Sequence, residues 1–179
     1  MKGSKSMNDV TLTINGKPVS GVTEPRVTLL DFLRDVAGLK GTHAGCEHGV
    51  CGACTVLIDG TAVRSCLMLA VQAEGEDIIT IEGIGGSGAR AGELGVIQDA
   101  FCETHGLQCG YCTPGMILAA EALLSVNTDP TEHEVREAIS AIFAVAPVMF
   151  RLSTPSYWRL NVLASAMMRR RLMRLWFRG

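Results

Sequence analysis

The stretch that decides the fold of this chain is Gly45–Cys54, with the sequence GCEHGVCGAC. Its three cysteines and a fourth further along, Cys66, follow the spacing C-x4-C-x2-C…C, which is typical of a plant-type [2Fe–2S] site. Two irons need four converging thiolates, so a tight loop supplies three of them and a neighbouring strand the fourth. Glycines in the loop let the backbone approach the cluster and point amides at its sulfides. The sequence therefore predicts an iron–sulfur site with the ligands Cys46, Cys51, Cys54 and Cys66.

Zinc and disulfides are the alternative uses of these cysteines. A C-x2-C pair is a common half of a structural zinc site, but zinc fingers usually pair one short knuckle with a second, and Cys66 stands alone on a predicted strand. The chain has seven cysteines, an odd number, and residues 1–6 are polar and lack the apolar core of a signal peptide. These features favour an iron–sulfur cluster held by reduced thiols.

The composition is that of a globular protein and excludes several function classes. With 179 residues, 47% of them hydrophobic, the chain fits one large domain or two small ones. A formal net charge of −2 and 5% aromatic residues do not favour nucleic acid. The longest apolar run, residues 138–150, is interrupted by Ser140 and Pro147 and is too short to cross a bilayer. We therefore expect a cytoplasmic protein that binds neither nucleic acid nor a membrane.

Residues 7–83 predict a small α+β domain. Alternating apolar residues flank the turn signals Asn15-Gly16 and Asp59-Gly60, which indicate two hairpins. Thr28 is placed to cap a short helix between them, with several leucines on its apolar face. A last strand is expected at Ile78–Ile81. Two hairpins with one helix packed across them place the cysteine loop on the C-terminal side of the helix.

The chain changes character after residue 83. Residues 84–93 are rich in glycine and predict a linker, because such a composition cannot pack. Beyond them the apolar residues recur with a helical period, so residues 94–150 predict an all-α helical bundle.

Three or four antiparallel helices are expected in this second domain, and three of them have boundaries in the sequence. The first spans Leu94–His105, and the second spans Thr113–Val126 with Thr113 as its cap. Thr131 and Glu134 form a capping box, which marks the start of the third.

A second cysteine pair, Cys109 and Cys112, precedes the second of these helices. Alone, such a C-x2-C pair indicates a redox dithiol, half a zinc site or half a second cluster. Together with the first motif, however, the string Gln108–Met116, QCGYCTPGM, resembles the iron–sulfur subunit of the molybdenum hydroxylases. This is the family of xanthine dehydrogenase, carbon monoxide dehydrogenase and the aromatic N-heterocycle or aldehyde oxidoreductases. The resemblance spans the chain from about Val10 to Ser140.

The resemblance implies an electron-transfer subunit, with a plant-type ferredoxin-like β-grasp domain followed by a helical [2Fe–2S]-binding domain. It implies no catalytic group on this chain, and electron flow from a molybdopterin on a large subunit to FAD on a medium subunit. By residue match, the outer cluster is held by Cys46, Cys51, Cys54 and Cys66. Cys109 and Cys112 supply half of the ligands of the inner cluster, and Gln108 matches the position that contacts the molybdopterin.

The chain departs from the family pattern after the third helix begins. The family's inner cluster needs a further C-x-C in a string like GNLCRCTGY, and this chain has no cysteine after Cys112. The present sequence of residues 141–149 is AIFAVAPVM. The codons of these nine residues can be regrouped in the frame that begins one base earlier. If the base before them is G, the genetic code permits GNICRCTGY in that frame, with cysteines at the positions of Ala144 and Ala146.

The tail, residues 151–179, has the look of unselected sequence, with seven arginines among tryptophans and methionines. We hypothesise that the helical domain is aberrant from about Ala141 and that this tail is translated out of frame. A basic amphipathic helix for an anionic membrane surface and a disordered tail are the alternatives.

Two other functions are compatible with parts of the pattern. A stand-alone ferredoxin-like electron carrier needs only the first four cysteines, although the helical domain with Gln108–Met116 argues against it. A zinc-stabilised interaction protein is the other. Among the remaining residues, Cys102 is expected to be a buried inert thiol, and His43 and His48 either tune the potential of the cluster or are solvated.

Overall fold

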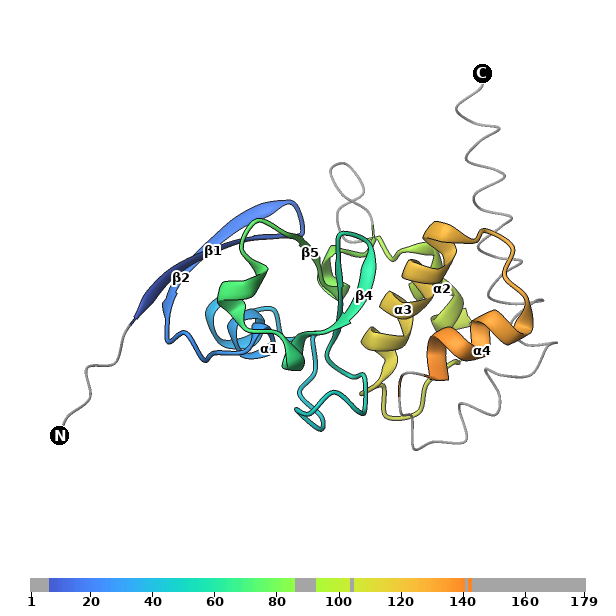
Figure 1. Cartoon of the computed structure of the whole chain (residues 1–179). Helices are drawn as coiled ribbons and strands as arrows, with labels where there is room; N and C mark the ends of the chain where they lie inside the picture. The colour runs from blue at the N-terminus through green and yellow to red at the C-terminus, as the bar shows by residue number, and fades with distance from the viewer. Residues whose placement is uncertain (1–6, 86–92, 104, 141, 143–179) are drawn as a thin grey trace, which may run out of the picture.

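The structure is a computed structural model in which residues 7–85, 93–103, 105–140 and 142 are described. A sheet-containing half is followed by a helical half, so the predicted α+β architecture is confirmed. Figure 1 shows the strands toward one end of the molecule and α2 (Val96–Glu103), α3 (Thr113–Val126) and α4 (Glu132–Ser140) grouped at the other. The middle of the predicted linker and the tail that we interpret as out of frame lie outside the described residues.

Five strands form one mixed sheet in the order β2-β1-β5-β3-β4. β1 (Asn8–Ile14) and β2 (Lys17–Thr23) form the first predicted hairpin, and β3 (Thr55–Ile58) and β4 (Thr61–Arg64) form the second. β5 (Asp77–Ile79) lies between the hairpins, parallel to β1 and antiparallel to β3. The last strand therefore joins the two hairpins into one sheet.

Both hairpin turns have the backbone that their sequences predict. Asn15 and Gly16 adopt φ values of 52° and 72°, and Asp59 and Gly60 adopt 48° and 80°. Positive φ at both central residues is the signature of type I′ turns, whose twist matches that of the flanking strands. The register of the first hairpin buries every second residue of β1 from Val10 onward.

A short helix follows the first hairpin and packs on the sheet. Thr28 Oγ1 accepts a hydrogen bond from the Asp31 backbone N–H (3.1 Å), which confirms the predicted cap. The helix begins as α1 (Leu29–Asp31) and continues as a π-helical segment, η1 (Phe32–Val36). Its buried face completes the core of this half. That core consists of Val10, Leu12, Ile14, Leu29, Phe32, Leu33, Val56, Ile58, Ala70, Ala73 and Ile78.

Two local predictions near the cysteines are wrong. Cys66 does not lie on a strand, because the pairing of β4 ends at Arg64, two residues earlier, and the chain turns into a 3₁₀ segment, η2 (Ser65–Leu67). Thr113 does not cap α3. Cys112 occupies the cap position instead, and the Thr113 hydroxyl is buried without a hydrogen-bond partner among the described residues. Both cysteines therefore lie where the backbone changes direction.

The helical half is built around α3, which packs against both α2 and α4. The capping box of α4 is confirmed, because Thr131 Oγ1 accepts from the Glu134 N–H (3.3 Å) and Glu134 Oε2 accepts from the Thr131 N–H (2.6 Å). Cys102 is exposed rather than buried, since α2 turns the face that carries Ala100 and Phe101 toward the core. The core residues are Ile97, Ala100, Phe101, Met116, Ile117, Ala119, Ala120, Leu124, Val135, Ile139 and Ile142.

The two halves touch where α3 begins. α3 packs on β3 and β4, and a Cβ atom added to Gly115 would lie 2.5 Å from the Gly52 carbonyl oxygen. Only glycine lets the helix approach the cysteine loop this closely. Two short 3₁₀ segments, η3 (Ala70–Ala73) and η4 (Ile81–Gly83), flank β5. Ile84, just after η4, packs on the helical core, so the first residue of the predicted linker belongs to this junction.

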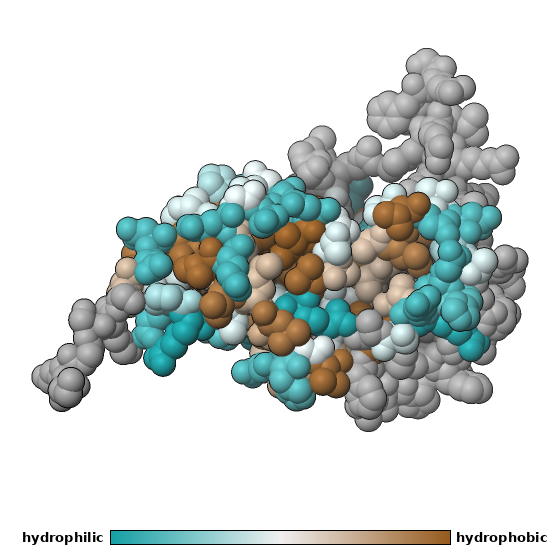
Figure 2. Space-filling view, viewed as in Figure 1, coloured by the Kyte–Doolittle hydropathy of each residue, from teal (hydrophilic) through white to brown (hydrophobic). Residues whose placement is uncertain are grey.

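On the face of the molecule shown in Figure 2, the hydrophobic side chains form separate groups among hydrophilic ones. Exposed hydrophobic residues near the cysteines include Val50, Leu67 and Leu107. Scattered apolar side chains of this kind are normal on a folded domain. Within the described residues, no helix is both long and apolar enough to cross a bilayer.

We predict that Gly115→Ala destabilises the protein by about 1–3 kcal/mol, the usual cost of overpacking. Alanine is otherwise the better helix former by about 1 kcal/mol, so a loss would arise from the clash with Gly52. Urea unfolding followed by circular dichroism measures the change. Ser125→Ala, at an exposed position of the same helix, is the control and should change stability by less than about 0.5 kcal/mol. Unchanged or increased stability of Gly115→Ala would contradict the close approach of the two backbones.

Candidate metal centre

Charged side chains from two elements anchor the start of the cysteine loop. Arg34, from η1, donates through Nη1 to the carbonyl oxygens of Lys40 (3.0 Å) and Thr42 (2.7 Å). Glu82, from η4, accepts through Oε1 a hydrogen bond from the Gly41 N–H (2.8 Å). Hydrogen bonds in which one partner is charged are stronger than neutral ones. The chain therefore enters the loop from a fixed position.

The first hairpin turn reaches the same anchor. Asn15 Oδ1 accepts from the Thr80 N–H (2.9 Å), and Asn15 Nδ2 donates to Thr80 Oγ1 (2.9 Å). Thr80 Oγ1 in turn donates to Glu82 Oε2 (2.6 Å). Sequence reasoning identified Asn15 only as a turn residue and missed Glu82, whose partner in the loop is 41 residues away. The turn, the end of β5 and the cysteine loop thus share one hydrogen-bonded network.

The four cysteines predicted as ligands lie in two pairs. The Cys46 N–H donates to Cys51 Sγ (3.3 Å), and the Cys51 N–H donates to Cys46 Sγ (3.2 Å). Cys54 and Cys66 are buried, and their thiols lie within hydrogen-bonding reach of each other. Cys46 is close enough to act electrostatically on Cys66, so the fold brings the two pairs together.

Two glycines keep the loop backbone close to the sulfurs. A Cβ atom added to Gly45 would lie only 2.7 Å from Cys51 Sγ. Gly52, the residue after Cys51, has a φ of +73°, in the left-handed region that favours glycine. A larger side chain at Gly45 would displace the thiol, and one at Gly52 would strain the loop.

Cys46 and Cys66, one thiol from each pair, differ in pKa. Hydrogen bonds from backbone N–H groups, that of Cys51 first, lower the pKa of Cys46 to about 6. Burial, helped by the neighbouring Cys54 thiol, raises the pKa of Cys66 to about 11. At neutral pH Cys46 is therefore mainly a thiolate, whereas Cys66 keeps its proton until a metal displaces it.

The donor set fits a binuclear iron–sulfur cluster. Within the part of the chain that the structure describes, no three or more His, Cys, Asp and Glu side chains are already arranged to hold a metal ion. Four thiols arranged two and two match a [2Fe–2S] cluster, in which the irons are held by four thiolates. Backbone amides that already point at sulfur are the groups that tune such a cluster. Cys46, Cys51, Cys54 and Cys66 could therefore hold it.

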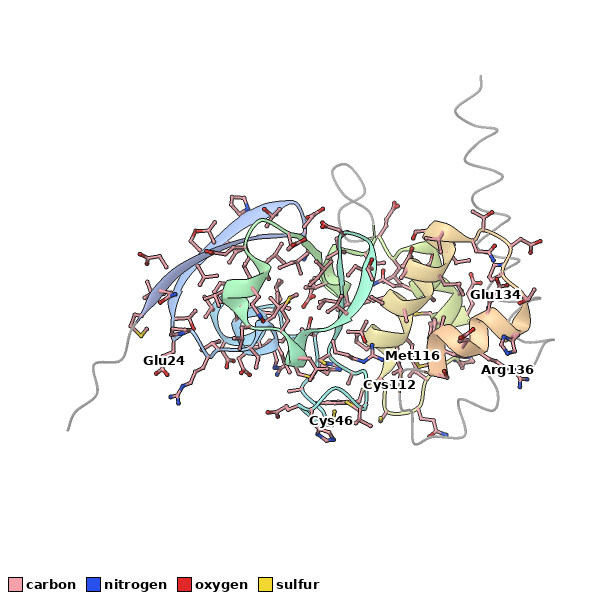
Figure 3. The ribbon with its side chains drawn as sticks, in the orientation of Figure 1. Glu24, Cys46, Cys112, Met116, Glu134 and Arg136 are labelled. Atoms are coloured by element: carbon pink, nitrogen blue, oxygen red, sulfur yellow. The ribbon has the colours of Figure 1, made fainter. Side chains whose placement is uncertain are left out.

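The second cysteine pair lies at the N-terminus of α3. Cys109 is exposed, whereas Cys112 is half-buried, and this burial raises the pKa of its thiol. The preceding residue, Gln108, is exposed. Figure 3 shows Cys112 and Cys46 on the same side of the molecule, in neighbouring loops. The positions where the family pattern places two further cysteines lie outside the described residues.

One side-chain contact joins the two cysteine loops. The rings of His43 and Tyr111 are stacked, with centroids 4.5 Å apart and planes inclined by 18°. His43 Nδ1 donates to the Tyr111 carbonyl oxygen (2.8 Å), and the Tyr111 hydroxyl donates to the Ala44 carbonyl oxygen. Sequence reasoning missed Tyr111, because a contact between residues 68 positions apart leaves no local pattern.

The chain matches two family models, the 2Fe-2S iron-sulfur cluster binding domain over residues 12–81 and the [2Fe-2S] binding domain over residues 80–144. The gamma subunit of caffeine dehydrogenase from Pseudomonas sp. strain CBB1 is 49% identical over 138 residues, which are 75% of this chain and 80% of that protein. The small FeS subunit of nicotinate dehydrogenase from Eubacterium barkeri is 49% identical over 136 residues, 75% of this chain and 84% of that protein. This chain belongs to the family of iron–sulfur subunits of molybdenum hydroxylases.

A solved structure agrees with this assignment. A chain of quinoline 2-oxidoreductase from Pseudomonas putida 86 superimposes with a TM-score of 0.76 at 42% identity, covering 92% of this chain and 98% of that chain. The predicted resemblance is thus confirmed. The chain is thus a [2Fe–2S] electron-carrier subunit of an oxidoreductase complex.

We predict that Cys46 of the metal-free subunit is alkylated far faster than Cys66 at pH 7. With a pKa of about 6, Cys46 is mainly thiolate at that pH, whereas Cys66, with a pKa of about 11, is mainly thiol. Iodoacetamide labelling at a series of pH values, read by peptide mass spectrometry, should show the Cys46 rate half-maximal near pH 6 and levelling off above about pH 7. The Cys66 rate should still rise beyond pH 9.

The urea-unfolded chain is the control for this experiment. Unfolding removes both the backbone hydrogen bonds to Cys46 and the burial of Cys66, so the two rates should converge. Equal rates in the folded protein would show that the loop does not separate the two pKa values.

Proposed function

We propose that this subunit relays single electrons from a molybdopterin centre on a large subunit, through [2Fe–2S] clusters, to FAD on a medium subunit. The observation that carries the proposal is the contact between the two cysteine loops through His43 and Tyr111. Two redox sites side by side give electrons a path through the subunit, whereas a stand-alone carrier needs only the first cysteine loop and its cluster. The relatives support the assignment to a complex, since they are named as subunits of caffeine and nicotinate dehydrogenases.

In this proposal the chain's own residues hold the clusters and shape their surroundings. A plant-type [2Fe–2S] cluster, when bound, takes up and releases one electron at roughly −400 mV. Four thiolates hold the outer cluster, and the N–H groups of Cys46 and Cys51 lie against sulfur, where they stabilise its negative charge. Buried Cys54 and Cys66 close the inner side of this site to water.

For the inner cluster we propose Cys109 and Cys112 as half of the ligands and Gln108 as the contact to the molybdopterin of the large subunit. Cys112 occupies the cap position of α3 and is half-buried, so the end of the helix fixes its place. Gln108 and Cys109 are exposed, which leaves their side of the loop accessible to a partner subunit.

A stand-alone ferredoxin-like carrier is the second candidate, because the sequence of this chain contains only one complete set of four predicted ligands. The helical half favours the relay, since a free carrier has no use for a second cysteine pair seated on a helix. Copurification separates the two functions. A relay subunit purifies with a large and a medium subunit, and a free carrier purifies alone.

We predict that the full chain binds a [2Fe–2S] cluster and that Cys51→Ala abolishes it, because one iron then lacks a thiolate. Iron and sulfide analysis with EPR of the reduced protein measures the cluster. Cys102→Ala, at an exposed cysteine outside both groups, is the matched control and should keep the full cluster content. A colourless protein that binds zinc would contradict the proposal.

We also propose a domain division at residues 7–83, 84–93 and 94–150, with the reading frame lost from about Ala141. The match to the helical family model ends at residue 144, close to that point. We predict that resequencing the gene over the codons for residues 138–149 reveals one missing base. The restored frame would read GNICRCTGY and supply cysteines in place of Ala144 and Ala146. A verified gene that encodes both alanines would refute the frameshift.

A further inference from the structure

His43 and Tyr111 connect the two cysteine loops from both sides. His43 lies in the first loop shortly before Cys46, and Tyr111 lies between Cys109 and Cys112. Their rings are stacked, and each side chain also binds the backbone of the opposite loop. The contact is therefore reciprocal, because each loop supplies one aromatic ring and one carbonyl acceptor.

The hydrogen bonds fix the orientation of both rings. A carbonyl oxygen can only accept, so His43 Nδ1 carries the proton that it donates to the Tyr111 carbonyl at 2.8 Å. The Tyr111 hydroxyl donates to the carbonyl of Ala44, the residue after His43. Stacking then restrains the faces of the rings while the hydrogen bonds restrain their edges. The pair thus sets both the separation and the angle of the two loops.

Burial alone does not hold the second loop in place. Tyr111 is 47% exposed and Cys109 is exposed, so this loop buries little apolar surface against the sheet half. Gly115 seats α3 on Gly52, but that contact lies after the cysteine pair in the chain. The segment that precedes the helix needs an anchor of its own, and the His43–Tyr111 pair is one.

We propose that His43 and Tyr111 are positioning residues, which hold Cys109 and Cys112 at one fixed distance and angle from the first [2Fe–2S] site. The inference rests on the proposed relay, in which electrons cross from one site to the other. The rate of electron tunnelling falls steeply with distance, so a second loop free to move would slow and spread this step. The stacked pair makes the distance a property of this chain rather than of its partner subunits.

The test measures the distance from the first cluster to Cys109 in the full chain. Cys102→Ser and Cys112→Ser leave Cys109 as the thiol that takes a reduction-resistant trityl spin label while the cluster protects the other four. The dipolar interaction between this label and the reduced cluster reports their separation. We expect one narrow distance distribution in this parent protein.

Four variants distinguish positioning from general stability. Tyr111→Leu removes the ring and the hydroxyl, and His43→Ala removes the other ring, so both should broaden or shift the distribution while the EPR signal of the cluster remains. Tyr111→Phe keeps the stack and should retain a narrow distribution. His133→Ala, at an exposed histidine of α4, is the matched control and should match the parent.

The outcomes separate this inference from the proposed function. Without a reduced-cluster signal in the parent, the proposed [2Fe–2S] site itself fails. With a signal, an unchanged distribution in both Tyr111→Leu and His43→Ala overturns the positioning role and leaves the relay intact. Loss of the cluster signal in both variants also counts against the inference, because the pair would then support the first site rather than its spacing from the second.

Discussion

The backbone of the cysteine loop has to touch the sulfurs, and much of the structure depends on that constraint. Reciprocal N–H···S contacts between Cys46 and Cys51 leave no room for a side chain at Gly45. Most of the loop before Cys51 is exposed or only half-buried, so packing alone holds it weakly. Its shape therefore comes from outside, from the charged groups of Arg34 and Glu82 that hold its first residues. The sheet and its helix serve as the frame that carries these anchors.

The helical half is placed by the same loop. Gly115 meets Gly52 backbone to backbone, and Cys112 stands at the end of the helix that makes this contact. The first cysteine loop therefore contacts the first turn of α3 through Gly52, and the second cysteine pair lies at the start of that same helix. In the relay proposed above, this short boundary places the two cysteine loops beside each other, where His43 and Tyr111 join them.

Local signals in the sequence predicted the elements whose cause is local. Asn15-Gly16 gives a type I′ turn, and Thr131 with Glu134 gives a capping box, because the partners lie within a few residues. The cysteine spacing predicted which sulfurs gather, since the loop length alone limits their separation. Thr113 shows the limit: its hydroxyl is buried at the junction, and the helix starts from Cys112 instead. Only the folded sheet brings distant partners together, so their contacts left no pattern to find.

The position of β5 makes the cysteine loop depend on a segment that follows it in the sequence. This strand lies between the two hairpins, and Glu82, which holds Gly41, follows it directly. A nascent chain that stops short of β5 has both hairpins but nothing to join them, and its cysteine loop lacks this anchor. Any chain that ends before residue 82 therefore lacks the carboxylate that holds Gly41 and with it one of the anchors of the cysteine loop.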